Sequence, residues 1–199
     1  MGTMREKLLR RAGTKPAPDE LILVQAFINS ADLGRGTDEL GNAVGLRDWL
    51  RELDLIDRSV RVTEADLIAA KAVREALRDL VLANNSGAGD TNPNALETLN
   101  RAARSAQLSA RFETGGRASL ESRAPGIDGA IGRILALAFN AMETGQWSRL
   151  KACPPDSCRW AFFDETKNRS GTWCAMSVCG NRAKARSFRK RHVTADHAH

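Results

Sequence analysis

"CAMSVCGNRAKARSFRKRH", residues 174–192, places two cysteines directly before a run in which nearly every second residue is basic. The other two cysteines of the chain, Cys153 and Cys158, lie a short distance upstream. The four therefore follow the spacing C-x4-C, fifteen residues, C-x4-C, all within 27 residues. Thiolates are both nucleophiles and metal ligands, so this stretch indicates either a reactive-thiol site or a metal-clamped module that presents a basic helix.

A structural zinc site accounts best for the cysteine spacing. Zn²⁺ prefers four thiolates in a tetrahedron, which two short turns supply when a hairpin between them brings them together. Segment 159–175 is expected to form that hairpin, with Trp160, Phe162 and Trp173 bordering a polar turn at 164–171. Disulfides, redox chemistry and an iron–sulfur cluster are the alternatives, although a C-x-x-C pair is absent. Four thiolates leave no open coordination position, so we expect one structural Zn²⁺ per chain. The expected ligands are Cys153, Cys158, Cys174 and Cys179.

The positive charge of the chain is concentrated near its C-terminal end. Residues 151–192 hold ten Lys and Arg against three acids, whereas residues 1–150 hold twenty of each kind. A neutral body with a basic end predicts a polyanionic partner, here DNA, and a solvated surface helix is the alternative. For Arg182, which shares a helical face with Cys179, support of the thiolates is an equal alternative. The candidate nucleic-acid-binding residues are Arg182, Lys184, Arg186, Arg189, Lys190 and Arg191.

Upstream of the cysteines, the hydrophobic periodicity predicts helices joined by glycine-rich or proline-marked turns. The first twenty residues show no clear pattern, and Asp19 is expected to cap the first helix. Thr63 opens a capping-box pattern, and Gly115–Gly116 lies between two alternating runs, which indicates a hairpin. Helices are expected at 20–32, 43–56, 63–83, 93–106 and 127–145, and the hairpin at 108–122. The sequence thus predicts a mainly α fold with a β-hairpin over residues 19–146, followed by a small treble-clef-like zinc finger over residues 150–192.

The sequence also excludes several classes of protein. It shows no signal-peptide pattern, and its apolar run at 134–142 is too short to span a bilayer. Residues 1–191 contain no histidine, which removes histidine-based hydrolase and nuclease chemistry, and no acidic cluster stands out. We therefore expect a cytoplasmic protein that is not an enzyme and has no membrane partner.

The chain closely resembles the CGNR zinc-finger family of bacterial proteins in four stretches. These are "CGNR" at 179–182, the preceding "WCAMSV", the C-x4-C-x-W at 153–160 and the following "AKARSFRKR". In that family the finger ends a chain whose N-terminal part is an ABATE domain, and members are described as stress-induced transcription regulators. Phe27-Ile28-Asn29-Ser30 looks like the Phe-x-Asn-Thr signature of that domain, with Ser in place of Thr. Asn29 is therefore a candidate ligand-binding residue, with a helix cap or a buried hydrogen-bonding group as the alternative.

The residues and the resemblance together favour a zinc-dependent, DNA-binding transcription regulator, cytoplasmic and nucleoid-associated in a bacterial cell. Its helical part would form a homodimer or bind an unknown small-molecule effector. The alternative is a finger that binds RNA or docks on a protein. A fragment ending near Gln146 retains every expected helix and no cysteine, so on this interpretation it folds alone.

Overall fold

The computed structural model describes residues 2–86 and 91–196, except for the side chains of residue 187 and residues 190–196. Its helices are α1 (Met4–Ala12), α2 (Leu21–Ile28), α3 (Ala43–Glu52), α4 (Glu64–Ala83), α5 (Pro93–Ser105), α6 (Gly126–Glu143) and α7 (Asn181–Asp196). Two shorter helical turns are η1 (Trp147–Arg149) and η2 (Met176–Gly180). The described strands form three antiparallel hairpins: β1–β2 (Ala31–Asp32, Thr37–Asp38), β3–β4 (Leu108–Glu113, Arg117–Ser122) and β5–β6 (Leu150–Ala152, Ala161–Phe163).

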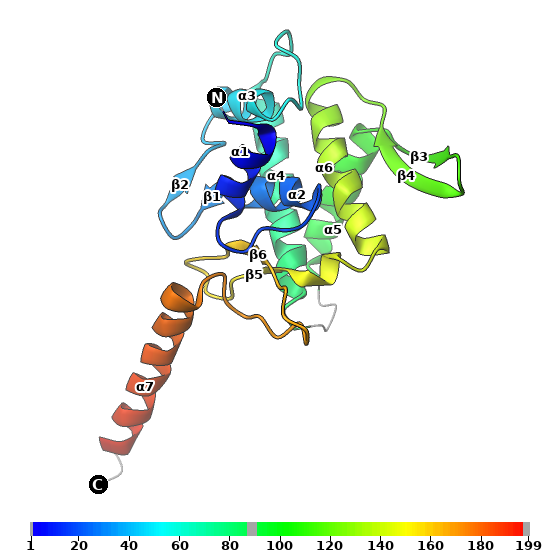
Figure 1. Ribbon diagram of the computed structural model, residues 1–199. Coiled ribbons are helices and arrows are strands. Elements are labelled where there is room, and N and C mark those ends of the chain that lie inside the picture. Colours follow the sequence, from blue (N-terminus) through cyan, green and yellow to red (C-terminus); the bar gives the residue numbers. More distant parts are fainter. Residues whose placement is uncertain (1, 87–90, 197–199) are drawn as a thin grey trace.

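Helix α2 lies at the centre of the molecule, where it contacts α1, α4, α6 and β6 (Figure 1). All eight of its residues are buried, because its sequence, LILVQAFI, is apolar on every side. The one polar member, Gln25, donates hydrogen bonds to the carbonyls of Ala12, Lys15 and Ala161. This buried amide therefore joins the segment before α2 to the far C-terminal segment.

Several sequence-based predictions are confirmed. Thr63 and Asp66 form the expected capping box at the start of α4, with reciprocal side-chain and backbone hydrogen bonds. Strands β3 and β4 pair around Gly115 and Gly116, whose φ angles of 86° and 75° suit glycine. The mainly α fold, the hairpin and the small C-terminal finger all agree with the prediction, while the treble clef itself stays a prediction.

The prediction for the first twenty residues is wrong. Thr3 and Glu6 form a second capping box that starts α1, and Leu8 and Ala12 of this helix are buried in the core. Asp19 does not cap α2, because Glu20 occupies the N-cap position, without a side-chain hydrogen bond. An isolated nine-residue helix is marginal in water, so packing against α2 is what stabilises α1.

The expected hairpin between the two cysteine pairs is also corrected. Strand β6 pairs backwards with β5, in the register Leu150 with Phe163 and Ala152 with Ala161, so the hairpin encloses the first cysteine pair. These four residues belong to the same hydrophobic core as the helices. The core therefore extends across the predicted boundary between helical body and finger.

No helix within residues 2–86 and 91–196 is both long enough and apolar enough to cross a membrane.

Candidate metal centre

The first cysteine pair lies in the turn of the β5–β6 hairpin. Cys153 follows β5 directly, and its backbone N–H donates to the Trp160 carbonyl at 2.9 Å, which continues the ladder by one bond. The N–H of Cys158 donates to the Pro155 carbonyl at 2.8 Å and closes a tight turn. Because the strands on both sides are buried, this turn is fixed to the core and holds the first two thiols in place.

A buried ion pair orders the loop that returns the chain from β6 to the second cysteine pair. Lys151 Nζ lies 2.8 Å from Asp164 Oδ2, and the same carboxylate accepts hydrogen bonds from the backbone of Thr166 and Gly171. Burial raises the pKa of Asp164, but the hydrogen bonds from Lys151 and Thr166 outweigh it and lower that pKa to about 2. The carboxylate therefore stays ionised and holds the loop through these hydrogen bonds.

The second cysteine pair lies where the chain enters η2 and α7, and the CGNR residues have distinct roles there. Cys179 lies inside η2, and Asn181 Nδ2 donates to the Ser177 carbonyl at 3.2 Å, across the same turn. A Cβ atom on Gly180 would lie 2.2 Å from Met176 Sδ, so the exposed Met176 side chain would have to move aside to admit it. The motif thus shapes the turn that presents the Cys179 sulfur.

The four cysteine sulfur atoms lie within 4.8 Å of one another. Three separations among Cys158, Cys174 and Cys179 are 3.6, 3.7 and 3.8 Å. A zinc ion with Zn–S bonds of about 2.3 Å has a tetrahedron edge of about 3.8 Å, whereas a disulfide needs about 2 Å. All four cysteines are unbonded to one another, so the cluster has the dimensions of a single Cys₄ zinc site.

The thiols of the cluster shift one another's ionisation. Hydrogen bonding to Cys158 raises the pKa of Cys153, and hydrogen bonding to Cys153 raises the pKa of Cys174. The reciprocal bond lowers the pKa of Cys158. Cys153, Cys158 and Cys174 are therefore coupled, and ionising all three together requires a cation among them.

One Zn²⁺ bound by the four sulfurs would have a structural role. Its coordination shell would be closed by protein ligands, which leaves no position for a substrate or a reactive water. Cys153 and Cys179 are buried, and Cys158 and Cys174 are half-buried. A small segment with few large side chains gains fixed geometry from such a centre.

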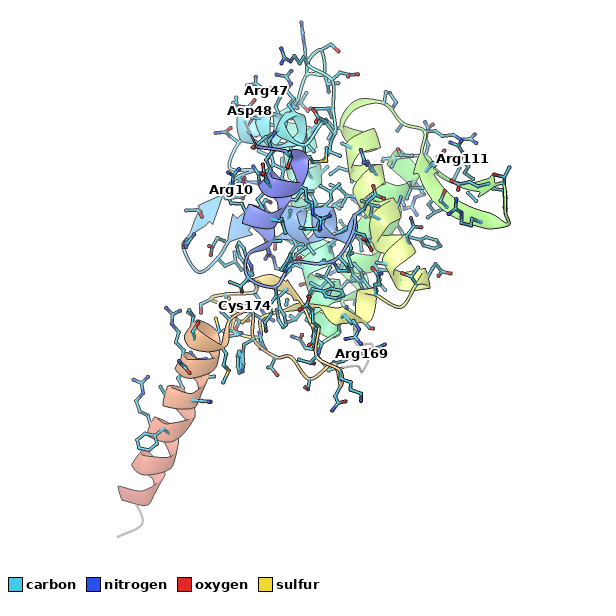
Figure 2. The ribbon with its side chains drawn as sticks, viewed as in Figure 1. Arg10, Arg47, Asp48, Arg111, Arg169 and Cys174 are labelled. Atoms are coloured by element: carbon cyan, nitrogen blue, oxygen red, sulfur yellow. The ribbon has the colours of Figure 1, made fainter. Side chains whose placement is uncertain are left out.

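The candidate nucleic-acid-binding residues lie on α7, which extends away from the helices (Figure 1). Figure 2 shows Cys174 where α7 meets the rest of the finger. The side chains of Lys190 and Arg191 lie outside the described residues. The described candidates Arg182, Lys184, Arg186 and Arg189 are all exposed.

Asn29 is buried and connects the helical body to the finger. Its Oδ1 accepts from the Ala161 N–H at 2.8 Å, and its Nδ2 donates to the Ala161 carbonyl at 3.0 Å. Asn84 and Asn85, at the end of α4, donate to the carbonyls of Leu150 and Ala152. The alternative expected for Asn29, a helix cap or a buried hydrogen-bonding group, agrees with the structure, in which Asn29 caps α2 and its amide binds Ala161. Sequence reasoning missed the contacts of Asn84 and Asn85.

Comparison with known proteins agrees with the resemblance. Residues 22–144 match the ABATE family model, described as "Putative stress-induced transcription regulator", and residues 149–192 match the CGNR zinc finger. No curated protein matches the chain. The ABATE match covers more than half of the sequence, and the two matches follow one another in the order that the resemblance implies. The chain therefore belongs to the ABATE family and ends in a CGNR zinc finger.

Proposed function

We propose that this protein is a DNA-binding transcription regulator in which the zinc finger holds α7 ready for contact with the DNA backbone. The observation that carries the proposal is the exposed, basic α7, which starts at the cysteine cluster and projects from the body (Figure 1). Before Asp196 this helix has six basic and no acidic residues. Such a surface attracts phosphates strongly and has no internal counter-charge to neutralise it.

Zinc would contribute by fixing the direction of α7. The first cysteine pair is held by the core through β5 and β6, and the second pair lies in the turn that starts α7. A metal bound to both pairs would couple the helix to the body, so that the helix meets DNA at a defined angle. Lys and Arg contacts with phosphates would then set the affinity, with one or two arginines left to read guanine edges.

The helical body, residues 19–146 of the proposed two-part organisation, would supply what one finger lacks. A single small DNA contact binds weakly, whereas two linked contacts gain affinity through effective concentration. We therefore propose that the body forms a homodimer or responds to an effector, in a cytoplasmic, nucleoid-associated protein. The closed Cys₄ centre supports a regulator rather than an enzyme. An RNA- or protein-docking finger is the second candidate, favoured by the same exposed α7.

Fluorescence anisotropy with the zinc-loaded full chain and labelled duplex DNA tests the proposal. Affinity should fall as salt rises, with a slope of about −0.9 per neutralised phosphate on a log–log plot. Replacing Arg186, Arg189 and Lys190 with Ala should flatten that slope by up to about 3, with zinc content unchanged. The matched control replaces three exposed arginines of the body with Ala, namely Arg101, Arg104 and Arg117. No salt-dependent association of wild-type protein with any duplex would overturn the proposal, and preferential binding of single-stranded RNA would favour the second candidate.

The Arg182→Ala variant separates the two roles open to this residue. If Arg182 offsets the negative charge of the thiolates, the variant should release zinc faster to a chelator and also bind DNA less tightly. If Arg182 contacts DNA, zinc release should be unchanged while affinity or sequence preference falls. Measuring zinc release and anisotropy on the same preparation distinguishes these outcomes.

A further inference from the structure

A hollow of about 420 Å³ lies between α3 and the segment that leads to α4, at the end of the body away from α7 (Figure 1). Its lining contains four arginines, two on α3 and two on that segment, namely Arg47, Arg51, Arg58 and Arg61. Among the described residues that line it, none is acidic. Residues 1–150 hold equal numbers of basic and acidic residues, so the hollow is a local concentration of positive charge. Its volume is within the range of small-molecule sites.

Arg51 holds the two walls of the hollow together. Its Nη2 atom donates to the carbonyl of Arg58 and, at 3.2 Å, to the carbonyl of Val60. The N–H of Val60 donates to the Asp57 carbonyl at 3.1 Å, which closes a turn in the same segment. The wall opposite α3 is therefore held in place by hydrogen bonds of the chain itself.

The other three arginines have hydrogen-bond donors to offer. Arg58 and Arg61 are exposed, and their guanidinium groups bond to no other group in the described part of the chain. Arg47 Nε donates to Asp48 Oδ1 at 2.9 Å, which leaves both Nη atoms for another acceptor. Figure 2 shows Arg47 and Asp48 at this end of the molecule. Asp48 lies outside the lining and offsets one of the four positive charges, so an excess of positive charge remains.

Apolar side chains form much of the remaining lining. Val44, which is 53% exposed, lies on the α3 side, and Val60 lies on the opposite wall. The hollow therefore suits a ligand that has both an anionic group and a small apolar body.

We propose that this hollow binds a small organic phosphate. A phosphate group carries up to two negative charges and three acceptor oxygens, so it can bind several guanidinium groups at once, whereas a carboxylate carries one charge. Arg58, Arg61 and Arg47 would bind the phosphate oxygens, and Arg51 would position Arg58. The valines would contact the organic part of the ligand.

A DNA backbone is the other source of phosphate groups. A duplex presents its phosphates on a convex surface, whereas these arginines line a hollow on the side of the body away from α7 (Figure 1). This arrangement favours a small ligand. As an effector site the hollow rests on the proposed function, to which it adds the chemical class of the effector, but binding of the ligand itself requires no DNA.

Isothermal titration of the zinc-loaded full chain with phenyl phosphate tests the site, with phenol and inorganic phosphate as partial ligands. Phenyl phosphate should bind at least about ten-fold more tightly than either, because phenol lacks the anion and inorganic phosphate lacks the apolar body. Arg58→Gln and Arg61→Gln should each weaken its binding by roughly five-fold or more, through loss of a charge-assisted hydrogen bond. Arg117→Gln, which removes another exposed arginine from β4, should leave it unchanged.

Competition with duplex DNA separates the two sources of phosphate. Excess duplex should leave phenyl phosphate binding unchanged, and the variant with Arg186, Arg189 and Lys190 replaced by Ala should bind phenyl phosphate as wild type does. Displacement by the duplex would assign the arginines to the DNA backbone and overturn the proposal.

Three results of the titrations would also overturn the proposed site. These are absence of phenyl phosphate binding, equal binding of inorganic phosphate or phenol, and equal effects of Arg58→Gln and Arg117→Gln. The titrations contain no DNA, so a protein that binds phenyl phosphate but no duplex would contradict the proposed function and leave the phosphate site intact.

Discussion

The two halves of the zinc finger are built in opposite ways. In the first half every residue of β5 and β6 is buried, and the strands share the hydrophobic core of the helical body. In the second half Met176 and Val178 are exposed, at 48% and 46%, as are the described basic side chains of α7. The cysteine cluster joins these halves. From this comparison we expect that one half folds as part of the body, whereas the other depends on the metal for its position.

The most disruptive test of this comparison removes the whole finger. A fragment that ends at Gln146 loses the core residues Leu150 and Phe163 and the carbonyls that Asn84 binds. Burial of two large apolar side chains and the hydrogen bonds together stabilise by more than about 5 kcal/mol, so the fragment should not unfold cooperatively. Urea unfolding followed by circular dichroism measures this.

The matched control is a chain that ends at Gly180, which lacks α7 and the three residues after it. It should keep nearly the full free energy of unfolding, because α7 lies outside the core. The shared core thus predicts the opposite of the expectation, formed from the sequence, that the body folds alone. Cooperative unfolding of the shorter fragment at an unchanged urea midpoint would restore that expectation.

A single side chain tests the connection between body and finger. Asn29→Ala removes both hydrogen bonds to Ala161 and leaves a buried N–H and a buried carbonyl with fewer partners. The free energy of unfolding should fall by about 2–4 kcal/mol. Asn100→Ala, at an exposed position of α5, should change it by less than about 0.5 kcal/mol. Equal effects of the two variants in urea unfolding would contradict a role for Asn29 in holding the finger.

The Lys151–Asp164 ion pair predicts a specific pH dependence. The pKa of Asp164 is lowered in the folded protein from 3.8 to about 2, so its contribution is fully present above about pH 4 and is lost as the pH falls towards 2. That contribution is about 2 kcal/mol. The difference in unfolding free energy between wild type and Asp164→Asn should therefore shrink over this window. A difference that stays constant from pH 7 to pH 2 would show that the ion pair does not supply it.

Loss of one cysteine from the exposed half should have the smallest effect on the body. Cys174→Ser should abolish stoichiometric zinc binding, because a hydroxyl is a poor replacement for a thiolate. The free energy of unfolding of the body should change by less than about 1 kcal/mol, since Cys174 is half-buried and outside the core. Elemental analysis and urea unfolding measure the two quantities. Cys153→Ser is the contrasting variant, because it places a hydroxyl at a fully buried position and should destabilise the protein more.

Local patterns predicted much of this structure. The capping box at Thr63, the Gly115–Gly116 hairpin and the cysteine spacing each depend on residues that are close in sequence. The cysteine cluster could be predicted because few sequence spacings allow four cysteines to bind one tetrahedral ion. Elements that are determined by residues close together in the sequence could therefore be predicted from it.

The features that were missed depend on distant partners. Helix α1 is stabilised by packing on α2, and β6 pairs with β5 rather than across the polar loop. Asn29 binds Ala161, which lies 132 residues away, and no local sequence pattern around either residue predicts this contact. The expected division between body and finger rests on local sequence patterns. The hydrophobic core that crosses this division depends on contacts between distant residues, which only the folded structure shows.

Hydrogen–deuterium exchange of the zinc-loaded and zinc-free full chain tests the central claim most directly. The account predicts that removing zinc exposes the amides of residues 174–189 to fast exchange, while the Ala161 amide, bound by Asn29, stays protected. Loss of protection at Ala161 and throughout β5–β6 together with α7 would contradict it, because the finger would then be one metal-dependent unit.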